Sequence, residues 1–152
     1  MTVDLDPIDR ALLRLLVQDA TCSAGALARA LDISQPNAWR RLDRLRSRGV
    51  IKGYRAVLDR EALGFGVAVF LGIKLALKGR VSIEDFERAV TAIPEVQTVE
   101  HVLGLYDYRL RVVARDIADF ERVLRRRIMT LPGVGDVEAN VLLSEERRPG
   151  PI

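Results

Sequence analysis

Residues 34–49, SQPNAWRRLDRLRSRG, decide the N-terminal part of the fold. Ser34 is a residue type that caps helices, and Pro36 suits a first helical turn because its missing N–H is not needed there. Gly49 suits the position just after a helix, where the backbone is often left-handed. The apolar residues of the stretch recur at helical spacing and are Ala38, Leu42 and Leu45. The stretch therefore predicts an amphipathic helix with a basic outer face.

Two further helices are predicted before this one. Asp6 and Pro7 stand where an N-cap and a first helical residue belong, and apolar residues follow them at helical spacing. Ser23 is the expected N-cap of a second helix, AGALARAL, and Asp32 tolerates the left-handed conformation of a tight turn. Apolar residues at 50–58 predict a short strand or hairpin. The whole pattern is that of a winged helix-turn-helix.

The positive charge of the chain is concentrated at this end. The formal net charge is +3, but residues 1–60 contain 11 Lys/Arg and 7 Asp/Glu, whereas residues 61–152 contain 13 and 14. Residues 35–55 hold seven basic residues and a single acid, Asp43. Such a segment attracts polyanions, so the basic helix is either a DNA-binding helix or a solvated charged face.

The composition excludes several classes of protein. With 49% hydrophobic and 30% charged residues, the chain is expected to be globular, not disordered. The acidic N-terminus lacks a signal-peptide layout and no apolar run approaches about 18 residues, so we expect a cytoplasmic protein without a membrane partner. One cysteine, Cys22, cannot form an internal disulfide and is expected in the core. One histidine, His101, is too few for a Cys/His zinc set.

The C-terminal part contains an internal repeat. IEDFERAV at 83–90 matches IADFERVL at 117–124, and IPEVQTVEHVL at 93–103 matches LPGVGDVEANVL at 131–142 with one extra residue. Each copy predicts a helix, a proline turn and a strand. The spacing from the phenylalanine to the proline is longer in the second copy, so its helix should be about one turn longer.

A further strand precedes each helix of the repeat, at 67–77 and 106–114, which gives a βαββαβ order. The fold class is therefore α+β, with a ferredoxin-like sheet after the helix-turn-helix. Residues 67–73 are apolar without alternation, which is typical of a strand buried on both faces. Since both helices cover the same face, we expect a second copy of the sheet to cover the other, making a homodimer.

The chain resembles the Lrp/AsnC family of transcription factors over nearly its whole length. The resemblance rests on motifs that occur in family order: LDPIDRALLRLL (5–16), LDIS (31–34), RRLDRLRSRGVIKGYRAVLD (40–59), LGF (63–65), GLYDY (104–108) and LPGV (131–134). It implies a winged helix-turn-helix domain at 1–52, a linker or hairpin at 53–65, and a RAM-type dimerisation and effector-sensing domain at 66–152. It also implies dimers that can assemble to octamers, and no cofactor.

The candidate contacts to double-stranded DNA come from the basic helix and the segment after it. They are Ser34, Gln35, Asn37, Trp39, Arg40, Arg41, Arg44, Arg46, Lys52 and Arg55. Gln35, Asn37 and Arg40 are the candidates for base contacts, because amides pair with adenine and guanidinium with guanine. The other basic residues are candidates for phosphate contacts. Two alternatives stay open: Trp39 could be core, and Arg41 could form a salt bridge within the domain.

The resemblance places a small-molecule effector at seven positions of the C-terminal domain. These are Leu103, Gly104, Leu105, Tyr106, Asp107, Val137 and Ala139. Four of them lack the polar groups common in the family, and a buried zwitterion needs polar partners, so an apolar or aromatic effector, or none, fits best. Asp107 could hold an effector ammonium or could instead cap the tight turn between strands.

The sequence thus predicts a sequence-specific DNA-binding regulator and no catalytic residue. An enzyme is the first alternative, because related two-domain proteins decarboxylate sirohaem, although only His101 could serve such a site. A lone histidine is more often a hydrogen-bonded structural residue. An architectural DNA-binding protein is the second alternative, since it would use the same DNA contacts.

Overall fold

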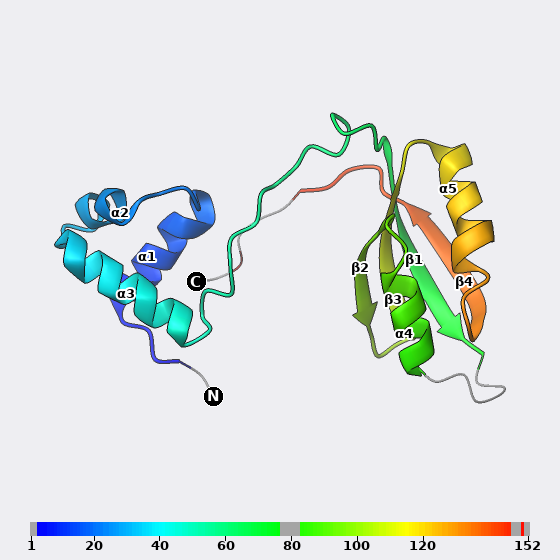
Figure 1. Cartoon of the computed structure of the whole chain (residues 1–152), viewed down its shortest axis with the longest axis horizontal. Coiled ribbons are helices and arrows are strands. Elements are labelled where there is room, and N and C mark those ends of the chain that lie inside the picture. The colour runs from blue at the N-terminus through cyan, green and yellow to red at the C-terminus, as the bar shows by residue number, and fades with distance from the viewer. Residues whose placement is uncertain (1–2, 77–82, 147–149, 151–152) are drawn as a thin grey trace. The chain divides into compact units, whose positions relative to one another are not determined.

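The computed structural model describes residues 3–76, 83–146 and 150, which belong to two compact units (Figure 1). One unit contains the residues up to Val57, with Glu146, and the other spans Leu58–Glu145. In the described part of the chain, no helix is both long and apolar enough to cross a membrane.

The first unit is built from three helices: α1 (Pro7–Gln18), α2 (Ala24–Ala30) and α3 (Gln35–Ser47). All three begin at the predicted caps. Asp6 accepts a hydrogen bond from the N–H of Asp9 at 2.8 Å, Ser23 caps α2, and Ser34 accepts one from Asn37 at 3.4 Å. Asp32 and Gly49 have φ angles of 51° and 71°, as the turn and the helix end require. The predicted helix-turn-helix is confirmed.

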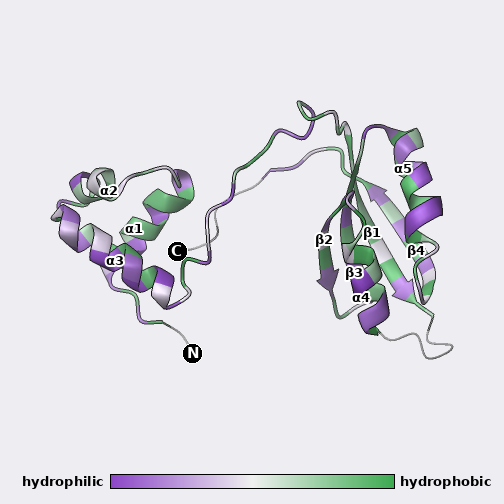
Figure 2. Cartoon of the chain, in the orientation of Figure 1, coloured by the Kyte–Doolittle hydropathy of each residue, from purple (hydrophilic) through white to green (hydrophobic). Residues whose placement is uncertain are grey.

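The core of this unit is formed by one apolar face of each helix. The buried leucines are Leu12, Leu13, Leu16, Leu27, Leu42 and Leu45. Cys22, which we expected in the core, is only half-buried at its edge, where its Sγ lies 3.5 Å from the carboxylate of Asp19 as a weak hydrogen-bond donor. Figure 2 shows α3 alternating between hydrophilic and hydrophobic residues, as expected for a helix with one buried face.

The strand or hairpin predicted at 50–58 is wrong, because the structure has no strand in this described segment. The N–H groups of Val50 and Ile51 both donate to the carbonyl of Leu45, at 2.9 and 3.2 Å, so they close the end of α3. Val57 and Leu58 are exposed. A strand needs hydrogen-bonding partners on a neighbouring strand, and this segment of the chain has none.

The second unit has the predicted βαββαβ order. Its elements are β1 (Val67–Leu75), α4 (Ile83–Thr91), β2 (Val96–His101), β3 (Tyr108–Ala114), α5 (Ile117–Val123), the π-helical segment η1 (Leu124–Ile128) and β4 (Val134–Val141). The strands form one antiparallel sheet in the order β2-β3-β1-β4 (Figure 1). The ferredoxin-like sheet is confirmed, and η1 supplies the extra turn predicted for the second helix.

The two helices of this unit cover one face of the sheet. Phe86 of α4 and Phe120 of α5 belong to the same buried cluster as Val69, Leu71 and Ile73 of β1. These strand residues alternate with Ala68, Phe70 and Gly72, which lie on the opposite face. We call the face that carries this second set the open face.

The open face of β1 is covered by side chains of the same chain. The guanidinium groups of Arg109 and Arg111 lie 5.4 and 5.7 Å from the ring centre of Phe70. The ring of Tyr106 lies against Gly72, so closely that a Cβ at that position would be 2.5 Å from a ring carbon. Strand β1 is therefore largely buried on both sides, as predicted, and Phe70 stays half-buried on the open face.

Tyr108 is the largest fully buried side chain among the described residues, and it should make the free energy of unfolding fall at alkaline pH. Burial and the hydrogen bond to Glu87, at 2.6 Å, raise the pKa of its phenol to about 12. The unfolded chain loses this proton at a pKa of about 10. The stabilisation that the protonated Tyr108 phenol gives the folded state is therefore complete below about pH 10 and is lost as the pH rises towards about 12.

An absorbance titration of the tyrosines, compared with that of a Tyr108→Phe variant, measures this pKa. The difference between the two curves should be one phenol that titrates near 12. A difference curve centred near 10, the ordinary tyrosine value, would contradict the prediction.

Candidate DNA-binding surface and effector site

Of the three positions predicted to contact bases, Gln35 and Arg40 are exposed on the first half of α3, and Asn37 is half-buried. Gln35, Pro36 and Trp39 line a shallow pocket of about 400 Å³. Trp39 is 61% exposed, so the alternative that it belongs to the core is wrong. Exposed amide and aromatic groups on the first turns of a helix can reach the edges of bases in a major groove.

A second, polar pocket of about 210 Å³ lies one turn further along α3. It is lined by Asn37, Arg40, Arg41 and Arg44. Arg40 is exposed and forms no ion pair with any residue that the structure describes. Its guanidinium is therefore available for an external acceptor, such as a guanine edge or a phosphate oxygen.

Arg41 and Arg44 differ from Arg40 because each is paired within the unit. The carboxylate of Asp9, 1% exposed, accepts from Nη1 of Arg41 at 2.7 Å and from Nη2 of Arg44 at 2.5 Å. Arg41 also donates to Asp6 at 2.6 Å and, through Nε, to the side-chain oxygen of Asn37 at 3.2 Å. The predicted alternative of a salt bridge for Arg41 is the arrangement found.

This network shifts the pKa values of Asp6 and Arg41. The hydrogen bond from Arg41 holds the pKa of the Asp6 carboxyl below its ordinary value, and Asp6 and Asp9 in turn raise the pKa of Arg41. Asp6 was predicted only as the N-cap of α1, and no role was predicted for Asp9. In the structure both acids also form the capping box of α1. Their second role could have been suspected from two acids near the start of α1 and a basic α3 packed against it.

The basic residues in the last turn of α3 and in the segment after it are exposed, and no strand of that segment holds them. Arg46 donates from Nη2 to the hydroxyl of Tyr54 at 3.1 Å, and its guanidinium carbon lies 5.6 Å from the centre of that ring. Lys52 and Arg55 are also exposed. Tyr54, predicted to lie in a strand, instead anchors one of the candidate phosphate contacts.

The predicted effector residues are divided between different places in the second unit. Leu103, Gly104 and Leu105 form an exposed turn between β2 and β3. Tyr106 lies on the open face, where its hydroxyl is hydrogen-bonded to Glu138 of β4. Val137 packs against the core on the face covered by the helices. Ala139, two residues along β4, shares that side of the strand. Within one described chain, these residues do not line a single cavity.

Asp107 ties its turn to the neighbouring strand. Its Oδ2 accepts from the N–H of Leu75 at 2.8 Å and its Oδ1 from Nζ of Lys74 at 3.1 Å. These two donors lower the pKa of the carboxyl, the backbone N–H more than the lysine. Two roles were predicted for Asp107, binding an effector ammonium and holding the turn. Within this chain its carboxylate is hydrogen-bonded to Lys74 and Leu75, which is the structural role.

His101 lies beside this turn and stacks on Tyr108, with ring centres 4.8 Å apart and planes within 15°. Across the described ranges, no three His, Cys, Asp or Glu side chains are grouped so that they could hold a metal ion. His101 is thus exposed and packed on an aromatic ring, whereas the expected role was that of a hydrogen-bonded residue.

Two family models match the sequence and together span most of it. The model described as winged helix-turn-helix DNA-binding matches residues 5–52, and the one described as the Lrp/AsnC ligand binding domain matches residues 68–152. The first match contains the exposed half of α3, and the second contains the sheet from Ala68 onward.

Individual relatives are similar over almost their full lengths. The DNA-binding transcriptional activator DecR of Escherichia coli is 36% identical over 141 residues, 93% of each chain. The proline dehydrogenase transcriptional activator of Rhizobium radiobacter is 34% identical over 149 residues, 98% of this chain and 96% of its own. A transcriptional regulator from Neisseria meningitidis, solved as a complex with L-methionine, has a TM-score of 0.89 at 26% identity and covers 95% of this chain and 94% of its own.

Proposed function

Since the chain belongs to the Lrp/AsnC family of DNA-binding transcriptional regulators, we propose that it recognises its operator through the exposed half of α3. The observation that carries this proposal is the contrast among the arginines of α3. Arg40 has no ion-pair partner among the described residues, whereas Arg41 and Arg44 are paired with Asp9. We assign base contacts to Gln35, Asn37 and Arg40, beside Trp39.

Arg46, Lys52 and Arg55 are assigned to the DNA backbone, together with Ser34 at the N-terminus of α3. Phosphate contacts fix the register of a protein on the duplex, whereas base contacts give specificity. Arg41 and Arg44 are assigned a smaller contribution to phosphate binding. Their charges are already matched by Asp6 and Asp9, so they orient α3 and present their remaining N–H groups to the same phosphates.

The two domains are assigned separate roles, DNA binding and dimerisation with effector sensing. Residues 1–52 bind DNA, residues 53–65 connect the domains, and residues 66–152 dimerise and sense the effector. The open face of the sheet, where Phe70 is half-buried, is the surface proposed for the second copy, and octamers are a further step of assembly. Because the protein acts on DNA, its proposed location is the cytoplasm.

Recovery of genomic fragments bound by the full chain tests the proposed function. A dimer should select fragments that share a pseudo-palindrome, with half-sites about one helical turn apart or a multiple of it. Binding to the best fragment should weaken steeply with salt, because each neutralised phosphate releases counterions. Broad recovery without a shared motif would favour an architectural protein, and no recovery would overturn the proposal.

Trp39 supplies an independent signal, since it is the single tryptophan of the chain and is 61% exposed. Contact with DNA moves its indole out of water, so its fluorescence emission should shift and weaken as a recovered fragment is added. Binding of the same fragment is followed separately by anisotropy of a labelled DNA. An unchanged emission at saturating DNA would remove Trp39 from the contact surface.

We propose that the effector of the C-terminal domain is an apolar small molecule. The N. meningitidis regulator was solved with L-methionine, an amino acid with an apolar side chain. The exposed turn of the present chain offers Leu103 and Leu105, and Asp107 is already engaged by Lys74. Calorimetric titration with L-methionine and, as the polar control, L-serine tests this proposal; tighter binding of serine would contradict it.

The alternative of a sirohaem-decarboxylating enzyme is not supported. The relatives described above are regulators, and His101 stacks on Tyr108. Incubation with sirohaem, followed by absorbance, checks this conclusion directly, because a bound and processed pigment would contradict it.

A further inference from the structure

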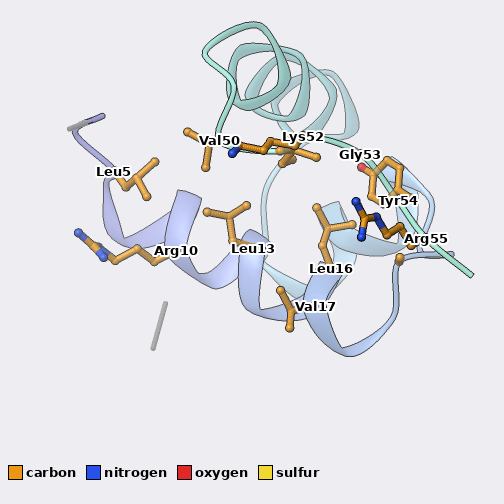
Figure 3. A pocket seen from close by; sticks show the side chains of 12 residues that line it. Leu5, Arg10, Leu13, Leu16, Val17, Val50, Lys52, Gly53, Tyr54 and Arg55 are labelled. Carbon is orange, nitrogen blue, oxygen red and sulfur yellow. The ribbon is translucent and has the colours of Figure 1, made fainter. Parts of the chain in front are cut away.

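A pocket of about 510 Å³ lies in the first unit, between α1 and the segment that follows α3 (Figure 3). Its lining residues are Leu5, Arg10, Leu13, Leu16, Val17 and Ala20, and Val50, Ile51, Lys52, Gly53, Tyr54 and Arg55. The volume lies within the range of about 300–1,000 Å³ that is usual for small-molecule sites. Of these residues, only Lys52 and Arg55 belong to the proposed DNA-binding surface.

The floor of the pocket is apolar. Leu13 and Leu16 of α1 lie in the middle of it, with Val17 beside them and Val50 opposite (Figure 3). Val17 is 50% exposed, which is high for a valine on a helix that packs into a core. Leu13 and Leu16 are already largely buried, so Val17 supplies most of the apolar surface that a ligand would remove from water.

The rim of the pocket is positively charged. Arg10, Lys52 and Arg55 are among its twelve lining residues, and no lining residue is acidic. In Figure 3, Arg10 lies at one end, Lys52 above the middle, and Arg55 at the other end. None of the three forms an ion pair with a described residue, in contrast to Arg41 and Arg44 of the same unit. The rim therefore lacks the counter-charge that a ligand could supply.

We propose that this pocket binds an apolar carboxylate, such as a fatty or aryl acid. The apolar part lies on Leu13, Leu16 and Val17, and the carboxylate is held by Lys52 and Arg55, with Arg10 adding positive charge. A small anion would match only the basic rim, and a neutral hydrocarbon would match only the apolar floor. A ligand with an apolar part and a carboxylate matches both.

Occupancy of the pocket should weaken DNA binding. This step rests on the proposed function, in which Lys52 and Arg55 bind phosphates. A bound carboxylate neutralises the same two groups, so carboxylate and DNA compete for them and each lowers the affinity for the other by the same factor. At saturation, the salt slope of DNA binding should fall by about two, one for each phosphate that Lys52 and Arg55 no longer neutralise.

Calorimetric titration of the full chain with sodium octanoate tests the site without DNA. Octan-1-ol has the same chain without the charge, and acetate has the charge without the chain. Octanoate should bind about tenfold or more tightly than either control compound, since a charge-assisted hydrogen bond and apolar burial both contribute. Equal binding of octanoate and octanol, or no binding of octanoate, would overturn the proposal.

Variants locate the site. Val17→Asp places a carboxylate on the floor and should weaken octanoate binding at least about tenfold, and Arg10→Ala should weaken it less. Arg126→Ala, which removes an exposed arginine of η1 in the other unit, should leave it unchanged. Circular dichroism shows whether each variant is folded. Octanoate binding that survives Val17→Asp in a folded protein would overturn the assignment of the site.

The regulatory step is measured separately, as DNA affinity with and without saturating octanoate. A loss of affinity in the wild type and in Arg126→Ala, but not in Val17→Asp, supports the coupling; unchanged affinity in all three overturns it. A chain that binds octanoate but no DNA fragment would instead contradict the proposed function. If octanoate does not bind and Val17→Asp breaks a dimer into monomers, a second copy covers the pocket and the proposal is wrong.

Discussion

Replacing Asp9 by alanine is expected to lower the free energy of unfolding of the first unit by about 3 kcal/mol, because it removes one partner of a buried ion pair. Asp9 is 1% exposed and accepts from both Arg41 and Arg44. Without it, Arg41 keeps only Asp6 as a charged partner, and its own side chain is 17% exposed. Urea denaturation followed by circular dichroism measures the change.

Asp43→Ala is the matched control, because Asp43 is an exposed acid on α3 that forms no ion pair within the described ranges. Its effect should stay within about 0.5 kcal/mol, the usual range for surface substitutions. Asp9→Asn should fall between the two, since it keeps an acceptor but removes the charge. Equal destabilisation by Asp9→Ala and Asp43→Ala would show that the network contributes little to stability.

The helices could be predicted from the sequence because their signals are local. A cap lies within three residues of the N–H group that it satisfies, as Ser23 and Ser34 do, and an apolar stripe repeats every three or four residues. The left-handed Asp32 is a local property too. These features of α1, α2 and α3 therefore needed no knowledge of the tertiary fold.

The prediction of a strand at 50–58 was wrong because a strand, unlike a helix, depends on residues far away in the sequence. The apolar residues of this segment fit a strand, but a strand forms only where another strand offers hydrogen bonds. The repeat in the second unit gave such partners to β1, β2, β3 and β4, and each of these strands is found. No comparable partner sequence exists near residues 50–58, so the same local signal produced no strand.

The site was predicted residue by residue, but the division among its arginines was not. Arg40 and Arg41 are neighbours of the same type, yet one is exposed and the other is held by Asp6 and Asp9, which lie 32 or more residues away in sequence. Which arginine meets those acids depends on how α3 packs against α1. Likewise, the open face of β1 is covered by Arg109, Arg111 and Tyr106, whose polar ends gave no sign of this role.

Replacing Arg40 by alanine is expected to weaken binding to the best recovered DNA fragment about tenfold to hundredfold, the effect typical of removing one guanidinium contact to a base. Arg40 forms no ion pair within the described unit, so little of this effect should arise from destabilisation. The variant should also discriminate less at one base-pair position. Affinities for the fragment and for single-base variants of it, measured by fluorescence anisotropy at fixed salt, test both expectations.

Arg46→Ala separates base recognition from phosphate binding. Arg46 is held beside Tyr54 by a hydrogen bond of 3.1 Å and is assigned to the backbone. Its removal should weaken binding evenly across the base variants and reduce the salt slope by about one. Arg126→Ala removes the same charge from the second unit and should do neither. If Arg40→Ala behaved as Arg46→Ala is expected to, lowering affinity evenly and leaving discrimination intact, Arg40 would be a phosphate contact, and specificity would rest on Gln35 and Asn37.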